Sequence, residues 1–106
     1  MQPIYRNSTY VFGVTITVSD VAVDIRNDTV TAYISRPNNL NDVKLEKDAD
    51  VATDGENGNA LFELLTTDTT LEPGRYNLQV LWTLSGGTRK FLIADTAIDV
   101  KERSNP

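Results

Sequence analysis

The sequence contains no cysteine and no histidine among its 106 residues. Without cysteine it can form neither a disulfide nor a zinc site with thiolate ligands. Without histidine it lacks the commonest general base and the proton carrier of a serine triad. Its serines have no neighbouring base to activate them, and no glycine-rich phosphate loop is present. We therefore expect a protein that is not an enzyme and that needs no cofactor.

Long apolar segments are absent as well. No apolar run approaches the ~18 residues of a membrane-spanning helix. The first residues, Met1 to Arg6, lack the apolar core of a signal peptide. These absences predict a chain that is synthesised in a cytoplasm and has no membrane partner.

The charge is negative and unevenly distributed. The net charge is −5, and residues 37–75 hold nine acidic side chains against three basic ones. An acidic surface repels phosphate, so we expect no nucleic-acid partner. The simplest interpretation of the acidic region is a solvated surface that keeps the protein soluble.

One acidic segment, residues 48–59, invites the hypothesis of a metal site because calcium takes about six to eight oxygen ligands. Its spacing departs from that of an EF-hand after Asp50, where three residues precede Asp54-Gly55. We favour a plain solvated turn and assign no metal ligand, with calcium binding left as the open alternative. The oxygen-bearing side chains are those of Asp48, Asp50, Asp54, Glu56, Asn57 and Asn59.

Alternating apolar and polar residues predict β-strands along most of the chain. The clearest strand is Tyr10 to Val18, and shorter ones are expected at residues 21–25, 29–35, 43–45, 51–53 and 59–66. No stretch has a helical period, so we expect an antiparallel β-sandwich of seven to eight strands. In the first two strands, the side chains expected to point inward are those of Tyr10, Phe12, Val14, Ile16, Val18, Val21, Val23 and Ile25.

The segment from Leu71 to Tyr76 is the most specific local signal. Pro73 fixes φ at about −65° and Gly74 accepts positive φ, so the pair predicts a type II turn. Tyr76 then opens a strand whose even-numbered residues, as far as Leu84, share one face. A tyrosine in this place is typical of the tyrosine corner of immunoglobulin-like sandwiches, in which its hydroxyl bonds to the backbone upstream. Leu71 is expected to cover the end of the core.

Beyond this strand, Gly86-Gly87 predicts a two-residue hairpin loop. Such a loop sets Trp82 opposite Phe91 and Val80 opposite Ile93. Cross-strand partners share a face, so both aromatic rings are expected in the core.

The strand after the hairpin changes parity along its length. Its first apolar residues are odd-numbered and its last ones are even-numbered. We therefore expect a bulge between Ala94 and Ala97.

Five apolar side chains fall on faces that the alternation assigns to solvent. Isolated exposed apolar residues are normal, whereas a cluster of them forms a patch that needs a partner. We take these five as the candidate partner-binding residues, namely Tyr33, Leu61, Leu65, Leu81 and Leu92.

Together these segments resemble the immunoglobulin-like domains of tailed-phage virion proteins, in particular the N-terminal domain of phage baseplate upper proteins. The resemblance implies a single domain over residues 1–106, with its core at roughly residues 9–100. It also implies that there are no catalytic residues, and that the partners are proteins within a virion, with a homo-oligomer among the arrangements it allows. The resemblance rests on Tyr10 to Val18, Val23 to Ile25, Thr29 to Ile34, Gly58 to Leu64, the Leu71-x-Pro73-Gly74-x-Tyr76 corner and the Gly86-Gly87 hairpin.

Baseplate upper proteins carry further domains after this one, whereas the present sequence stops at Pro106. The resemblance thus implies a small accessory component of the particle, such as a head decoration, head–tail or tail component, synthesised in the host cytoplasm. The alternative is a glycan-binding or adhesive surface module that uses Trp82 or the tyrosines as stacking platforms. The inward parity of Trp82 favours a core role over ligand contact.

Overall fold

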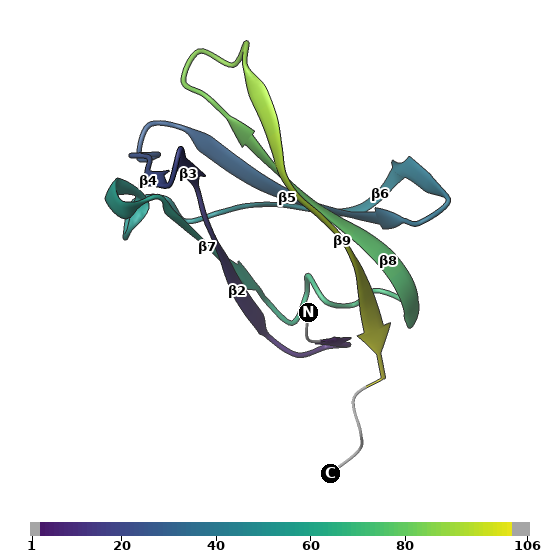
Figure 1. The fold of residues 1–106 in the computed structure, drawn as a ribbon. Coiled ribbons are helices and arrows are strands. Elements are labelled where there is room, and N and C mark those ends of the chain that lie inside the picture. Colours follow the sequence, from purple (N-terminus) through teal and green to yellow (C-terminus); the bar gives the residue numbers. More distant parts are fainter. Residues whose placement is uncertain (1–2, 103–106) are drawn as a thin grey trace.

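The computed structural model describes residues 3–102, which form two main β-sheets that face each other (Figure 1). The larger sheet has five strands in the order β1-β9-β8-β5-β6. The protein is therefore all-β, as the sequence predicts. The strands of this sheet are β1 (Ile4–Tyr5), β5 (Thr29–Arg36), β6 (Asn39–Asp48), β8 (Gly74–Thr83) and β9 (Lys90–Lys101).

The facing sheet consists of β2 (Tyr10–Thr15) and β7 (Asn59–Leu64), and a 3-10 helix, η1 (Gly55–Asn57), precedes β7. A separate hairpin is formed by β3 (Thr17–Val18) and β4 (Val21–Ala22). All strand pairs are antiparallel except β1 with β9, which run parallel. The expectation of a purely antiparallel sandwich with seven to eight strands is thus wrong for this pair and for the number of strands. Three of the nine strands found within residues 3–102 have only two residues, which is too few to produce an alternating pattern in the sequence.

The core lies between the two sheets and follows the period-two pattern. The even-numbered apolar side chains of β5, β7 and β8 are buried, as predicted. Ile4 joins them with 1% of its side chain exposed, although it precedes the expected core of residues 9–100. Phe62 stacks on Phe12 with 4.7 Å between ring centroids, which joins the two strands of the smaller sheet. The buried residues of the three strands are Val30, Ala32, Ile34, Ala60, Phe62, Leu64, Tyr76, Leu78, Val80 and Trp82.

The predicted strand Tyr10 to Val18 is interrupted at Ile16. Beyond it, β3 and β4 are joined through Ser19 and Asp20, whose φ angles of 53° and 65° make a type I′ hairpin turn. The side chains of Val18 and Val21 are 55% and 67% exposed, so their predicted inward orientation is wrong. The physical reason is that this hairpin lies outside the two facing sheets, and neither of its faces is covered (Figure 1).

The middle of the chain also differs from expectation. β6 has ten residues, whereas the sequence predicts only a short strand around residues 43–45. The predicted strand at residues 51–53 does not form, because the Asp50 carboxylate accepts hydrogen bonds from the backbone N–H groups of Ala52 and Thr53 and folds them into a turn. Pro37 and Asn38 form the turn between β5 and β6.

The β8–β9 hairpin has the predicted register near its loop, where Trp82 pairs with Phe91. The bulge occurs earlier in β9 than expected, between the Leu81–Leu92 and Val80–Ala94 pairs. Val80 therefore lies opposite Ala94 and not opposite Ile93. Phe91 is 46% exposed, and its predicted place in the core is therefore wrong. No covering strand lies over this end of β9 within residues 3–102.

The segment before β8 is fixed by the side chain of Tyr76, whose ring is buried and whose hydroxyl donates a 2.6 Å hydrogen bond to the carbonyl of Glu72. Leu71 is half-buried and packs against the core, as expected. The predicted type II turn does not form, because Gly74 has a φ of 148° where that turn needs about +80°. Gly74 instead opens β8 opposite Val100.

Candidate interaction surfaces

The five residues that the sequence assigns to partner contact lie on two different faces of the molecule. Tyr33, Leu81 and Leu92 lie on the outer face of the five-stranded sheet, on β5, β8 and β9. Leu61 and Leu65 lie on the outer face of the smaller sheet, on β7 and directly after it. The structure therefore does not gather them into one patch.

On the outer face of the five-stranded sheet the apolar area is small. Leu81 and Leu92 are cross-strand partners, but only Leu92 is largely exposed, at 53%. Tyr33 lies in an adjacent row, opposite Gln79. Burial, reinforced by the negative charge of Glu46, raises the pKa of the Tyr33 hydroxyl. Because their neighbours on the sheet are polar, Tyr33, Leu81 and Leu92 do not form a continuous apolar surface.

On the outer face of the smaller sheet, Leu61 and Leu65 are joined by Val11 around a cleft of about 420 Å³. These three side chains are 40%, 46% and 64% exposed. The rest of the lining is mostly charged and comes from Lys47, Asp48, Asp50 and Glu63. This cleft thus combines an apolar floor with a mainly acidic rim.

One ion pair connects β6 to the turn that follows β7. The Lys47 ammonium lies 2.8 Å from Asp68 Oδ2, and the backbone N–H of Leu65 donates to the same oxygen at 2.8 Å. These hydrogen bonds lower the pKa of Asp68 below its ordinary value of 3.8. The folded chain therefore binds this proton less tightly than the unfolded chain does. The stability that Asp68 contributes is present above about pH 5 and is lost as the pH falls through the folded-state pKa.

Replacing Asp68 by asparagine is expected to lower the free energy of unfolding at pH 7 by about 1–2 kcal/mol, because two hydrogen bonds to a charged group are weakened. The variant should also lose less stability than the unmodified protein between pH 7 and pH 3, and urea unfolding at both pH values measures this difference. Glu63→Gln, the same change at an exposed carboxylate, is the control and should stay within about 0.5 kcal/mol. Equal losses of stability with pH in the two proteins would contradict the assignment.

The acidic segment 48–59 uses its carboxylates for local turns. Asp54 accepts hydrogen bonds from the side-chain amides of Asn57 and Asn59, and Asp50 accepts them from Thr53 and Ala52. These bonds lower the pKa of both carboxyl groups. Within residues 3–102, no group of three or more ligand-type side chains is arranged to hold a metal ion.

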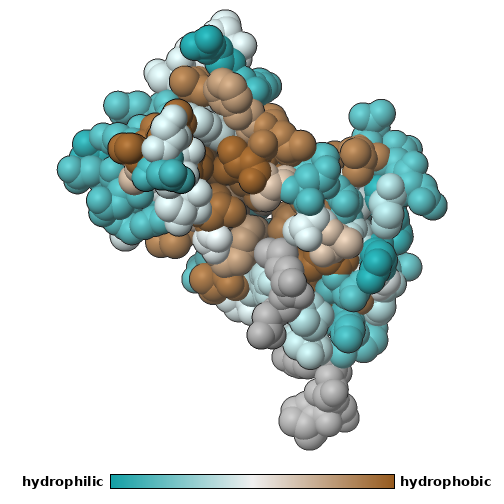
Figure 2. Space-filling view, in the orientation of Figure 1, coloured by the Kyte–Doolittle hydropathy of each residue, from teal (hydrophilic) through white to brown (hydrophobic). Residues whose placement is uncertain are grey.

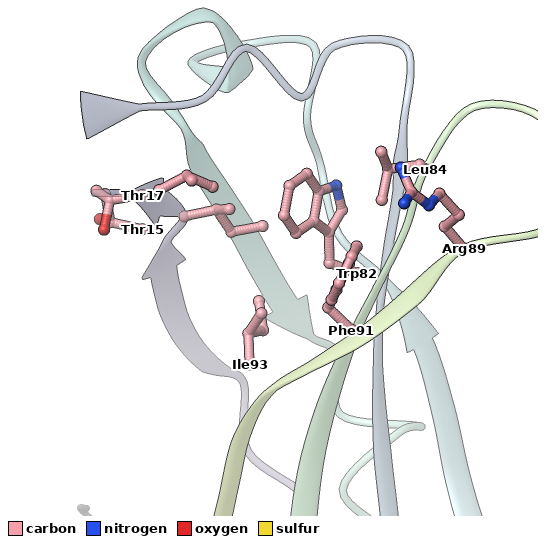
Figure 3. Close-up of a pocket in the computed structure, with 9 residues that line it drawn as sticks. Thr15, Thr17, Trp82, Leu84, Arg89, Phe91 and Ile93 are labelled. Carbon is pink, nitrogen blue, oxygen red and sulfur yellow. The ribbon is translucent and has the colours of Figure 1, made fainter. Parts of the chain in front are cut away.

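A larger and more apolar cleft, of about 610 Å³, opens between the β2–β3 segment and the β8–β9 hairpin. Figure 2 shows it as a hollow in which hydrophobic side chains gather, between the lobe that carries β3 and β4 and the hairpin. In Figure 3 the ring of Trp82 lies at its centre with Phe91 beside it, while Thr15 and Thr17 lie on the opposite wall. The complete lining is Thr15, Ile16, Thr17, Val18, Trp82, Leu84, Arg89, Phe91 and Ile93.

Trp82 is held in this cleft from both sides. Its indole N–H donates to Asp28 Oδ2 at 2.9 Å, and the other oxygen of the same carboxylate accepts the backbone N–H of Ser85 at 2.9 Å. Its ring lies 5.4 Å from that of Phe91, and only 8% of the residue is exposed. The exposed surface of the cleft therefore comes mainly from the side chains around Trp82, above all Phe91.

The sequence pattern did not reveal this cleft. Parity correctly places Trp82 on the inner face, but it cannot show that no strand covers Phe91 and Ile93. Two signals in the sequence bear on it. Residues 10–18 contain neither charge nor proline, and the odd parity of Phe91 and Ile93 departs from that of the rest of β9.

No protein-family model and no curated protein matches this sequence. The described part of the chain contains no helix that is long and apolar enough to cross a membrane.

Proposed function

We propose that this chain is a non-enzymatic structural component of a bacteriophage particle, such as a head decoration, head–tail, tail or baseplate accessory protein, and that it works by protein–protein contact. The observation that carries the proposal is the apolar cleft beside Trp82, with Phe91 and Val18 exposed at its walls. Contiguous exposed apolar surface of this kind marks a contact site in a folded protein. On this proposal its partners are other proteins of the particle.

We also assign the all-β fold to the immunoglobulin-like class. The hydrogen bond from the Tyr76 hydroxyl to the Glu72 carbonyl supports this, because such a bond is the feature of a tyrosine corner. The strand order supports it as well. The neighbours β9-β8-β5-β6 follow the order of the sheet that contains the last strand of a variable-type domain, and the β2–β7 pair follows that of the opposite sheet.

The location within a phage particle is supported by the sequence resemblance to phage virion domains. Mass spectrometry of purified particles of the phage that encodes this chain is expected to detect it at many copies per particle. Particles that lack the chain, at a depth where their other structural proteins are detected, would contradict the proposal.

A further inference from the structure

The smaller sheet is open along one edge, because within residues 3–102 β2 pairs with β7 and with no other strand. The N–H of Ile16 donates to the carbonyl of Gly58 at 2.8 Å, and on the far edge of β7 Leu61 exchanges two backbone hydrogen bonds with Asp50. Bonded pairs alternate in an antiparallel ladder, so the even-numbered residues of β2 direct their backbone groups to β7. The backbone N–H and C=O groups directed along the open edge are those of Val11, Gly13 and Thr15.

The core is incompletely covered beside this edge. The inward side chains of β7, at residues 60, 62 and 64, are at most 1% exposed. Those of β2, namely Tyr10, Phe12 and Val14, are only half-buried although they point to the same core. The difference shows that core surface remains uncovered along β2.

A second open edge faces the cleft from the other sheet. Apart from β8, the strand β9 pairs only with β1, at Val100 and Lys101. The long part of β9 that begins at Phe91 therefore has one unpaired edge among the described residues. The 610 Å³ cleft is bounded by the end of β2 on one side and by Phe91 and Ile93 of β9 on the other.

The edge of β2 carries none of the features that usually prevent pairing. Folded proteins protect exposed edges with lysine, proline, bulges or very short strands. The segment Tyr10 to Val18 has no charged residue and no proline, and its β2 part is regularly paired over six residues. These properties are those of an edge that accepts another strand.

The charge in the lining of the cleft is positive, in contrast to the net charge of −5 of the whole chain, while the Asp28 carboxylate behind Trp82 is taken up by the Trp82 and Ser85 N–H groups. Arg89 is the only charged residue in the lining, and Lys90 follows it. Within the described part of the chain, neither side chain has a carboxylate within ion-pair distance. A carboxylate on the occupant would complement this end of the cleft.

We propose that the open edge of β2 and the cleft beside it bind one extended strand of another protein, with apolar side chains at alternate positions and a carboxylate where it passes Arg89. The proposal rests on the proposed function and names its contact surface. The bound strand would pair with the backbone of Val11, Gly13 and Thr15, while every second side chain enters the cleft. A second copy pairing through its own β2 is a poorer match, because residues 10–18 contain no carboxylate to face Arg89.

The test uses two blocked octapeptides of alternating valine and threonine that carry glutamate at the first or the last position, titrated calorimetrically into the protein. One of them is expected to bind, and hydrogen exchange of the amides of Val11, Gly13 and Thr15 should slow at least tenfold in the complex. Val11→Pro removes one donor from the open edge without removing a bond to β7, and should weaken binding at least about fivefold. Val11→Ser, which loses the same apolar side chain but keeps the donor, is the matched control.

Exchanging the charges of Arg89 and of the peptide tests whether the peptide carboxylate lies at Arg89, which fixes the direction of the bound strand. Arg89→Glu should weaken the glutamate peptide that binds and should strengthen the same peptide with lysine in place of glutamate. No binding of either glutamate peptide at millimolar concentration, or equal affinities of Val11→Pro and Val11→Ser, would overturn the proposal. A dimer in light scattering that Val11→Pro dissociates would also overturn it and assign the edge to a second copy. Absence of the chain from phage particles would contradict the proposed function alone and leave the peptide result intact.

Discussion

Replacing Phe62 by alanine is expected to lower the free energy of unfolding by about 3–5 kcal/mol, which is a large part of the stability of a domain of this size. Phe62 is fully buried, and its ring stacks on Phe12 at 4.7 Å between centroids. Removing it leaves a cavity between the sheets that neighbouring strands cannot fill. Urea unfolding followed by tryptophan fluorescence measures the loss, since Trp82 reports on the same core.

Phe91→Ala is the matched control for this change, because it deletes the same side chain at a site that is 46% exposed. We expect it to cost about 1 kcal/mol. If the two substitutions destabilise the protein equally, Phe91 is covered in solution and the cleft beside Trp82 is closed. That result would contradict the description of an open side of the sandwich.

The second large effect is expected for Gly58→Ala, with a loss of more than about 3 kcal/mol. Gly58 has a φ of 80°, and a β-carbon there would lie 2.5 Å from the carbonyl oxygen of Ile16 and 3.2 Å from that of Val23. Both contacts are with backbone, so no side chain can rotate away. The alanine must displace the chain around Ile16, where β2 meets β3 beside the cleft.

Gly87→Ala separates the cost of the steric clash at Gly58 from the cost of placing an alanine at positive φ. Gly87 has nearly the same φ, 78°, but a β-carbon there meets nothing within 4 Å. We expect a loss of only about 1 kcal/mol, the ordinary cost of a left-handed alanine. Thermal unfolding of the two variants gives the comparison, and equal losses would show that the approach of Gly58 to Ile16 is not as close as described.

The strands that form the buried core could be predicted from the sequence because their alternation is uninterrupted. This holds for the inward residues of β5, β7 and β8, including Tyr76. It fails for the β3–β4 hairpin, where Val18 and Val21 continue the alternation although no opposing sheet covers them. Parity tells which side chains share a face, but not whether anything lies over that face.

The candidate contact surfaces were harder to predict for the same reason. Leu61 and Leu92 are exposed as expected, yet they lie on opposite faces of the sandwich. The open edge of β2 depends on which strands are neighbours, and that is set by contacts between distant parts of the chain. Phe91 illustrates the consequence, because its pairing with Trp82 was predicted correctly while its exposure was not.

The most direct test of the claim that this chain works by protein contact is hydrogen exchange of residues 10–18, measured by mass spectrometry in the free protein and in purified phage particles. We expect fast exchange of this segment in the free protein, since the amides of Val11, Gly13 and Thr15 point away from β7 and have no partner strand among the residues that the structure describes. In the particle the same segment should exchange at least tenfold more slowly, while the acidic segment 48–59 changes little. Identical exchange of residues 10–18 in both states would show that this segment makes no contact in the particle.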